Sequence, residues 1–376
     1  MIDFQKLPSP CFVLDEQLLD RNLAVIDRVR RESGAEVIVA LKACAMWSIF
    51  PELAQHSDGA TASSLAEARL VFEEFGRPAH TYAPVYTDRN IEEILDCSDH
   101  ITFNSVAQFE RFGQMALLRG ISCGLRINPG YSPVETDLYN PCVPGSRLGI
   151  PAGELKELPA GAEGLHFHVL CESRPEHLRL ALDAVEKRFG RFLDRIKWLN
   201  MGGGHLMTHK DYDCDELIRI LQEFKAKYPN LRLILEPGSA FTWRTGYLVS
   251  TVEDIVENGG VRTAMLDVSF ACHMPDCLEM PYKPAILGAR DPEPGEKGWR
   301  MGGNSCLAGD YYGDWIFDRD LRVGDRIVFE DMIHYTMVKT TMFNGVAHPA
   351  IAIVRRDGAI EIIREFGYED FKSRMS

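Results

Sequence analysis

The sequence predicts an α/β fold in which a (β/α)₈ barrel, of the TIM-barrel type, is joined to a second, mainly antiparallel β domain. At 376 residues, the chain exceeds the size at which a single hydrophobic core usually stops growing. Short apolar runs alternate with amphipathic stretches from residue 37 to residue 238, which indicates βα units around a parallel sheet. After residue 245, β-branched and apolar runs bounded by Gly and Pro replace this alternation.

Eight apolar runs are predicted to be the strands of the barrel. They lie near residues 37–42, 59–62, 80–84, 100–104, 123–128, 164–170, 197–201 and 231–236. Helical periodicity between them is clearest at residues 64–75, 106–118 and 213–227. A doubly wound open sheet is the alternative, because strand counts made from one sequence are error-prone.

The change of pattern near residue 245 also predicts the domain boundaries. We expect residues 16–245 to form the barrel, and residues 1–15 together with 246–376 to form the β domain. The run CFVLD at residues 11–15 could supply this second domain with a strand.

Composition and charge limit the classes of partner. The formal net charge of -14 disfavours nucleic acid as a partner and mildly favours a cationic substrate. No apolar run approaches membrane-spanning length, and the first residues do not resemble a targeting segment. The ten cysteines include no Cys-x-x-Cys pair, which fits a reducing compartment. We therefore expect a cytoplasmic enzyme with no nucleic acid or membrane partner.

Polar side chains follow the predicted strands at the end where a barrel carries its active site. Lys42 closes the apolar run VIVALK. Burial favours the neutral amine, which can form an imine with an aldehyde. A snorkelling or ion-paired lysine is the alternative. The other strand ends give Thr61, Ser63, Ser64, Asn104, Arg126, His168, Gly202, Gly203, Gly204 and Glu236.

Two of these segments suit a phosphorylated aromatic cofactor. LNMGGGH at 199–205 places three glycines after a predicted strand, where bare backbone N–H groups can approach a phosphate. A tight turn is the alternative, since the segment lacks GxGxxG spacing. In ILEPGSAF at 234–241, Glu236 ends the last strand and could keep a pyridine nitrogen protonated, so that the ring accepts electrons. A turn cap or a lysine ion pair is the alternative there.

The segment GLHFHVLCES at 164–173 places His166 and His168 on one face of a predicted strand, because strand side chains alternate. Metal binding is one alternative and a structural role is another. No third ligand stands at a recognisable spacing, so the sequence predicts no metal site. His168 could instead lie flat against a cofactor ring.

In order and position, these residues match the fold-type III pyridoxal phosphate decarboxylases, which the chain resembles over nearly its full length. This family includes ornithine, diaminopimelate and biosynthetic arginine decarboxylases. The resemblance implies that the cofactor is pyridoxal 5'-phosphate (PLP), that Lys42 holds it as a Schiff base, that His168 stacks on its ring and that Glu236 pairs with its nitrogen. The other cofactor contacts that it implies are Arg126, Gly202, Gly203, Gly204, Gly238, Ser239 and Tyr335.

Cys306 in GNSCLAGD at 303–310 matches the cysteine that the neighbouring subunit inserts into the active site in this family. With Lys42 and His168 it completes the implied catalytic set. A thiol can return a proton to the substrate carbon after carbon dioxide leaves. The resemblance therefore implies a homodimer with active sites at the subunit interface.

Longer blocks resemble one group within the family, the carboxynorspermidine or carboxyspermidine decarboxylases of polyamine biosynthesis. These blocks are residues 40–51, 58–70, 266–282 and 338–345. Leu307 stands where ornithine and diaminopimelate decarboxylases usually carry an acidic residue, which favours a different substrate. The implied substrate is a polyamine with one α-amino acid end, and the product is norspermidine or spermidine. Its candidate contacts are Glu236, Asp267, Asp276, Glu279, Asp310 and, for the carboxylate, Arg147.

Two alternatives remain open. A diaminopimelate or ornithine decarboxylase would share the same cofactor site. A non-catalytic regulator with a PLP-enzyme fold would typically lack the lysine or the glycines, both of which are present here. The sequence does not rank carboxynorspermidine against carboxyspermidine, because one methylene changes no recognisable motif.

Overall fold

The computed structural model describes residues 2–376 and divides them into two compact units. One unit runs from Asn22 to Phe241, and the other combines the chain up to Arg21 with Thr242–Ser376. Among the described residues, no helix has both the length and the apolar character that crossing a membrane requires.

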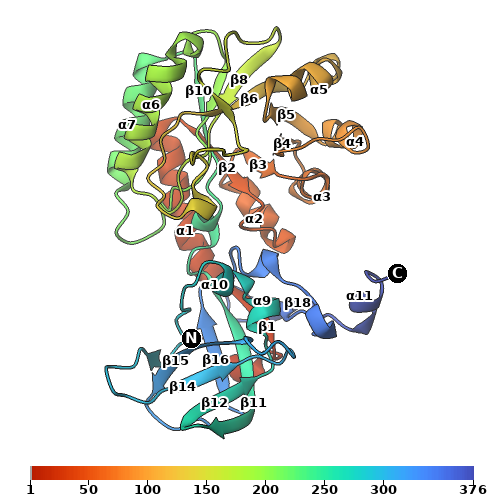
Figure 1. Ribbon diagram of the computed structural model, residues 1–376, viewed down its shortest axis with the longest axis vertical. Helices are drawn as coiled ribbons and strands as arrows, with labels where there is room; N and C mark the ends of the chain where they lie inside the picture. Colours follow the sequence, from red (N-terminus) through yellow and green to blue (C-terminus); the bar gives the residue numbers. More distant parts are fainter. Residues whose placement is uncertain (1) are drawn as a thin grey trace. The chain divides into compact units, whose positions relative to one another are not determined.

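The unit Asn22–Phe241 contains a closed barrel of eight parallel strands, so the predicted fold class is confirmed (Figure 1). Its strands are β2 (Glu36–Ala40), β3 (Gly59–Ala62), β4 (Ala79–Tyr82), β5 (Ser98–Phe103), β6 (Ser122–Asn128), β8 (Ala162–His166), β9 (Trp198–Asn200) and β10 (Arg232–Leu235). The spatial order is β5-β4-β3-β2-β10-β9-β8-β6, and pairing of β5 with β6 closes the ring. The short strand β7 (Ile150–Pro151) pairs with β6 as an addition to this ring.

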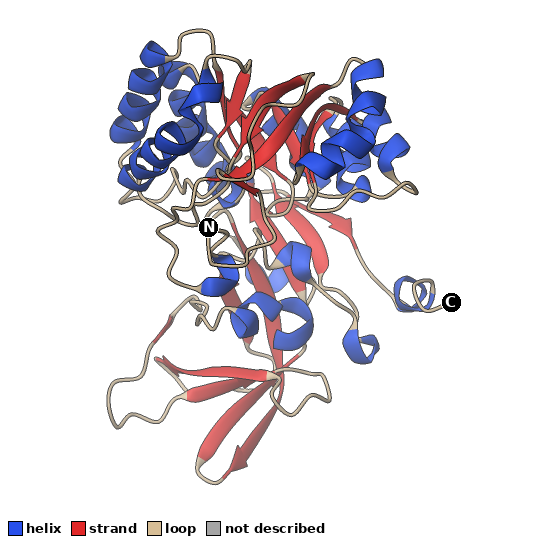
Figure 2. Cartoon of the chain, turned by 45° about the horizontal axis from the view of Figure 1, so that its top comes forward, coloured by secondary structure: helices blue, strands red, loops and turns tan. Residues whose placement is uncertain are grey.

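Helices lie around the outside of these strands (Figure 2). They are α1 (Glu16–Ser33), α2 (Phe50–Gln55), α3 (Leu65–Leu70), α4 (Ile91–Asp96), α5 (Val106–Leu118), α6 (Pro175–Leu193), α7 (Cys214–Lys227) and α8 (Ser239–Thr242). The helix predicted at 106–118 is α5, and the helix predicted at 213–227 is α7, whose first turn is capped by Asp213. The helix predicted at 64–75 is α3 continued by a π-helical turn.

The predicted strand 164–170 is too long, because β8 ends at His166. After His166, the chain makes hydrogen bonds to other segments in place of the regular bonds between neighbouring strands. Arg126 donates to the carbonyl of His168 over 3.2 Å, and Gly203 donates to the ring of His168 over 3.0 Å. His168 therefore lies in the loop that follows the strand.

The barrel interior is packed around one large ring. Trp198 in β9 is only 2% exposed. A Cβ atom at Gly124 would lie 2.2 Å from this indole, and one at Gly164 would lie 2.0 Å from it. Glycine at these two positions on β6 and β8 therefore makes room for the tryptophan. Nearer the strand starts, its Nε1 donates to the Ser122 hydroxyl over 2.9 Å.

The second unit is built on a nine-stranded, mainly antiparallel sheet, as expected. The run CFVLD is strand β1 (Cys11–Asp15), which pairs with β11 (Gly246–Asn258) and β17 (Ala350–Val354). The remaining strands are β12 (Val261–Leu266), β13 (Ala289–Arg290), β14 (Trp299–Gly302), β15 (Tyr311–Phe317), β16 (Arg326–Glu330) and β18 (Ile360–Arg364). Its helices include the short α9 (Phe270–His273), α10 (Pro275–Glu279) and α11 (Tyr368–Lys372).

Candidate active site

Lys42 follows β2 directly and lies beside a histidine from across the barrel. Its Nζ is 3.3 Å from Nε2 of His168. Burial lowers the pKa of the Lys42 amine, although the nearby Glu236 carboxylate acts in the opposite direction. The pKa of Lys42 is therefore shifted toward the neutral amine, in the direction that the sequence suggests.

The hydrogen bonds of His168 define its tautomer. The backbone N–H of Gly203 donates to Nδ1 over 3.0 Å, so that nitrogen carries no proton. Burial, with Lys42 acting in the same direction, holds the pKa of His168 well below its usual value, and the neutral ring then carries its proton on Nε2. That N–H faces the Lys42 nitrogen.

Glu236 follows β10 and is nearly buried, with 9% of the residue exposed. Its carboxylate accepts a hydrogen bond from the Asn200 amide over 2.6 Å. Burial raises its pKa, while Lys42, Asn200 and Arg126 act to lower it. His166 lies 3.8 Å away, and within residues 2–376 neither of its buried ring nitrogens has a hydrogen-bond partner. Glu236 is thus a shielded carboxylate poised to share a proton.

Arg126 extends the same cluster from β6. Its guanidinium lies 4.7 Å from the centre of the Tyr82 ring. Burial raises the pKa of Tyr82, and the charges of Arg126 and Arg147 act to lower it. Arg147 itself is exposed, and its carbonyl accepts from Asn104 over 2.8 Å. Both predicted arginines therefore lie on the polar side of the barrel.

The glycine segment after β9 makes closer contacts than a simple turn needs. A Cβ atom at Gly203 would lie 2.4 Å from the carbonyl oxygen of Glu236, and one at Gly204 would lie 2.3 Å from that of Leu170. The N–H of Gly202 donates to Asn200, and the N–H of Gly203 is bonded to His168. These bonds leave the Gly204 amide as the glycine donor for an anion.

Gly238 and Ser239 follow Glu236 at the start of α8. A Cβ atom at Gly238 would lie 2.5 Å from that of Ala43, so only glycine fits against the residue after Lys42. The backbone of Ala40 donates to Pro237 over 3.1 Å. The structure therefore joins the segment after β10 to the strand end that carries the lysine.

The predicted residues of the second unit form their own arrangement. Cys306 is exposed, and its N–H donates to the Asn344 side chain over 2.9 Å. Asp310 is buried, and its two carboxylate oxygens accept from the backbones of Ala271 and Ser305, each over 3.0 Å. Asp310 thus shapes the loop that carries the cysteine. Tyr335 has a φ of 37°, a left-handed conformation that non-glycine residues adopt mainly at special sites.

The other predicted acidic residues differ in how many of their carboxylate oxygens already accept hydrogen bonds. Asp267 accepts from the hydroxyl of Ser250 over 2.7 Å and from the backbone of Thr251 over 2.9 Å. Asp276 accepts through Oδ2 from Tyr282 and Thr336, but its buried Oδ1 has no partner within residues 2–376.

Glu279, the remaining acidic candidate, is about half exposed. It pairs with Lys339 over 2.6 Å. Asp276 is therefore the acidic candidate with a buried acceptor to offer a cationic ligand.

Sequence reasoning missed three members of the barrel site. Asn200 precedes the glycine segment, Tyr82 ends β4, and Glu67 in α3 contributes its charge to the surroundings of Lys42. Asn200 is the last but one residue of the predicted strand 197–201, so its place near a strand end could have indicated it. Tyr82 lies in the middle of the predicted strand 80–84, and it ends β4 because that strand stops two residues earlier than predicted. Glu67 has the sequence context of an ordinary acidic residue in the first turn of a helix, so no sequence pattern marks it as a site residue.

The fold and this strand-end cluster define a barrel enzyme built around a lysine whose pKa is lowered by its surroundings. The chain belongs to the pyridoxal-dependent decarboxylase family, whose description as "Pyridoxal-dependent decarboxylase, C-terminal sheet domain" matches residues 11–333. The predicted class of enzyme, a decarboxylase of this family, is therefore confirmed.

Within this family, two relatives that are more similar to the chain act on carboxylated polyamines, as their names state. The chain is 55% identical to a carboxyaminopropylagmatine decarboxylase of Synechocystis, with 98% of this chain and 96% of the relative covered. It is 40% identical to a carboxynorspermidine/carboxyspermidine decarboxylase of Campylobacter jejuni, with 99% of each covered.

A solved structure gives the same picture. The crystal structure of carboxynorspermidine decarboxylase from C. jejuni, complexed with norspermidine, matches with a TM-score of 0.90 at 38% identity. The match covers 98% of this chain and all of that one. These comparisons confirm the resemblance to carboxynorspermidine decarboxylases drawn from the sequence.

The strand-end cluster fits a pyridoxal cofactor. It offers an amine whose pKa is shifted toward the form that reacts with an aldehyde, a buried carboxylate for a ring nitrogen and glycines that no side chain could replace. The His166 nitrogens, which have no partner among the described residues, indicate that the protein alone does not satisfy the cluster.

Proposed function

We propose that this chain removes carbon dioxide from the α-amino acid end of a carboxylated polyamine, using PLP held by Lys42. The observation that carries the proposal is the position of the Lys42 Nζ, 3.3 Å from Nε2 of His168, at the strand ends that also hold Glu236, where burial lowers the pKa of the amine. The family membership and the relatives named above support the same reaction.

Each barrel residue has a distinct task in this proposal. PLP, when bound, supplies an electron-accepting ring joined to an imine. Glu236 holds a proton for the ring nitrogen, because burial favours its sharing a proton over carrying a bare charge. His168 is held by the N–H of Gly203 and orients the Lys42 nitrogen. The phosphate is contacted by the Gly204 amide, Ser239 and Tyr335. Arg126 adds positive charge on the same side of the barrel.

We assign proton return to Cys306. Its side chain is exposed, and the loop that bears it is organised by Asp310, whose carboxylate lies so close to Gly303 that a Cβ there would be 2.4 Å away. In the proposed homodimer, this loop completes the site of the partner subunit. The enzyme acts in the cytoplasm as part of polyamine biosynthesis.

The dimer can be tested by mixing two inactive homodimers, Lys42→Ala and Cys306→Ala, under conditions that allow subunit exchange. If each site uses the lysine of one subunit and the cysteine of the other, about a quarter of the sites in the mixture regain both residues. Activity near that level supports the shared site. Activity no higher than the sum of the two variants contradicts it.

The candidate substrates differ at the end that lies away from the α-amino acid group. Carboxynorspermidine and carboxyspermidine end in an amine, whereas carboxyaminopropylagmatine, named for the 55% identical relative, ends in a guanidinium. The buried Oδ1 of Asp276, which has no partner among the described residues, can accept from either cation, and the hydroxyls of Tyr282 and Thr336 hold the carboxylate in place. All three compounds therefore deserve comparison.

The test is release of carbon dioxide from these three compounds, with diaminopimelate and ornithine as controls. We expect the carboxylated polyamines to give a kcat/KM at least about 100-fold higher than the small amino acids, because only their longer chains carry an internal amine and place the distal cation far from the α-carbon. Lys42→Ala should abolish both turnover and the borohydride-trapped cofactor adduct. Equal rates on ornithine, or full turnover by the variant, would contradict the proposal.

A further inference from the structure

A second polar cluster lies at the opposite end of the barrel, where the strands begin. His80 is the second residue of β4, and His100 lies beside it in β5. Their rings stack with centroids 3.9 Å apart and an angle of 20° between their planes. Both side chains are close to buried, with 13% and 12% exposed.

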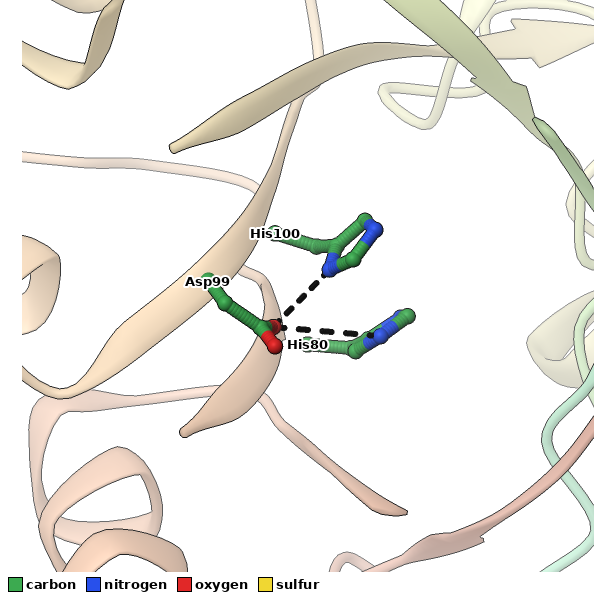
Figure 3. Close-up of side chains that lie close together, drawn as sticks. All are labelled: His80, Asp99 and His100. Atoms are coloured by element: carbon green, nitrogen blue, oxygen red, sulfur yellow. Dashed lines mark hydrogen bonds and ion pairs between the residues drawn. The ribbon is translucent and has the colours of Figure 1, made fainter. Parts of the chain in front are cut away.

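A β-bulge brings a carboxylate to these rings. Ala79 pairs with Ser98 and His80 pairs with His100, so Asp99 is the extra residue of β5. A bulge re-aims the side chain that it inserts. Figure 3 shows the Asp99 carboxylate turned toward both histidines, with Oδ1 2.8 Å from Nδ1 of His100 and 3.9 Å from Nε2 of His80.

Two of the three side chains favour the protonation state of a metal ligand. Burial and the neighbouring His100 lower the pKa of His80 to about 3, so its imidazole is neutral near pH 7. Burial acts to raise the pKa of Asp99, but its hydrogen bond to His100 and the electrostatic influence of the two neighbouring histidines hold it below the usual value. The nearby positive charge of Arg232 is engaged in two bonds to Glu36 of 2.7 and 2.8 Å.

Hydrogen bonding alone does not satisfy the cluster. The Asp99 oxygen is bonded to Nδ1 of His100, but Nε2 of His80 lies 3.9 Å from the same oxygen, too far for a hydrogen bond. The single Asp99 oxygen faces two imidazole nitrogens, and the candidate ligand atoms all lie within 4.8 Å of one another. Two imidazoles with one carboxylate are a ligand set that suits zinc and related ions.

We propose that His80, Asp99 and His100 bind a divalent transition-metal ion of the Zn²⁺ class at this end of the barrel. The ion takes Nε2 of His80, Nδ1 of His100 and one Asp99 oxygen, with water in the remaining position. Asp99 is 50% exposed, so its carboxylate has room to move and leaves an entry path for the ion. The ion braces β4 against β5 where the bulge interrupts their pairing, and it takes no part in decarboxylation.

The site is tested on the PLP-loaded protein after treatment with a chelator and desalting. Titration with ZnCl₂ by calorimetry should show one saturable site per chain, and Co²⁺ should give visible bands typical of nitrogen and oxygen ligands. Asp99→Asn and His100→Gln should each weaken binding by more than about tenfold, since even an outer-shell change often costs that much. Unchanged cofactor absorbance and circular dichroism would show that the variants fold.

Two controls separate this site from adventitious binding. His209→Gln changes a histidine beside another aspartate, with Nδ1 4.0 Å from Asp211, and should leave the stoichiometry unchanged. Cys306→Ser removes the exposed thiol and should also leave it unchanged. Absence of saturable binding, or full binding by both Asp99→Asn and His100→Gln, would overturn the proposal. Loss of the site in Cys306→Ser would overturn it as well.

Discussion

The polar side chains at the two ends of the barrel are satisfied in different ways. At the carboxyl end, burial lowers the pKa of Lys42 and of His168, and the nitrogens of His166 have no partner in the described chain. At the amino end, outside the His80–Asp99–His100 cluster, Glu36 bonds Arg232 twice, and Glu163 pairs with Lys197. The unsatisfied groups at the carboxyl end can contact a ligand, whereas the charge pairs at the amino end stabilise the protein.

The largest expected contrast is between two glutamates, one at each end. Glu236→Gln keeps the shape and the hydrogen-bonding capacity toward Asn200 but cannot take or give the ring proton. We expect kcat to fall by about 10²- to 10³-fold. Stability of the protein without cofactor should not fall, because burial already disfavours the charge. The measurements are kcat with a carboxylated polyamine and the free energy of unfolding.

Glu163→Gln is the matched control at the amino end. It breaks the pair with Lys197 and weakens the bond to Ser122, both far along the strands from the cofactor residues. Turnover should stay within about twofold of the parent. If both variants lost turnover equally, the functional distinction between the two ends would be wrong.

The sequence predicted the carboxyl end better than the amino end for a physical reason. Apolar runs mark where a strand is buried, and the polar residue that ends each run marks the rim of the barrel. Lys42, Arg126 and Glu236 were found in this way, and the structure places them in one cluster.

The cluster at the amino end could not be found by the same reasoning. His80 and His100 come from separate strands, and Asp99 reaches them only because of a bulge that leaves no mark in the hydrophobic pattern. The length of β8 was also misjudged, because residues 167–170 stay largely buried after strand pairing ends. The hydrophobic pattern predicts which residues are buried, whereas it does not predict where the pairing between strands shifts or ends.

A second prediction concerns pH and the carboxyl end. Burial lowers the pKa of His205, next to the glycine segment, to about 4. The unfolded chain binds this proton near pH 6.5, so between these values the unfolded state holds more protons and stability falls as the pH falls. The full effect approaches about 3 kcal/mol by pH 4, at about 1.4 kcal/mol for each pKa unit.

This effect is measured as the free energy of unfolding in urea between pH 6.5 and pH 4. His205→Gln should show a shallower loss of stability over that range, because glutamine binds no proton. His209→Gln, a change in a more exposed histidine of the same loop, should follow the parent. Parallel curves for the parent and His205→Gln would show that the buried histidine does not control the acid response.

The smallest expected effect is at the amino end, in the pair Glu36–Arg232. Its side chains are 30% and 48% exposed, so water screens the charges despite the two short hydrogen bonds. A double-mutant cycle with Glu36→Gln and Arg232→Gln should give a coupling energy of about 0.5 to 1 kcal/mol, which falls as salt is added. A coupling above about 2 kcal/mol that resists salt would mean that this end behaves as a buried network. In that case the charge pairs at the amino end, like the groups at the carboxyl end, would depend on exclusion of water. The contrast between the two ends would then rest only on binding of the cofactor and the substrate.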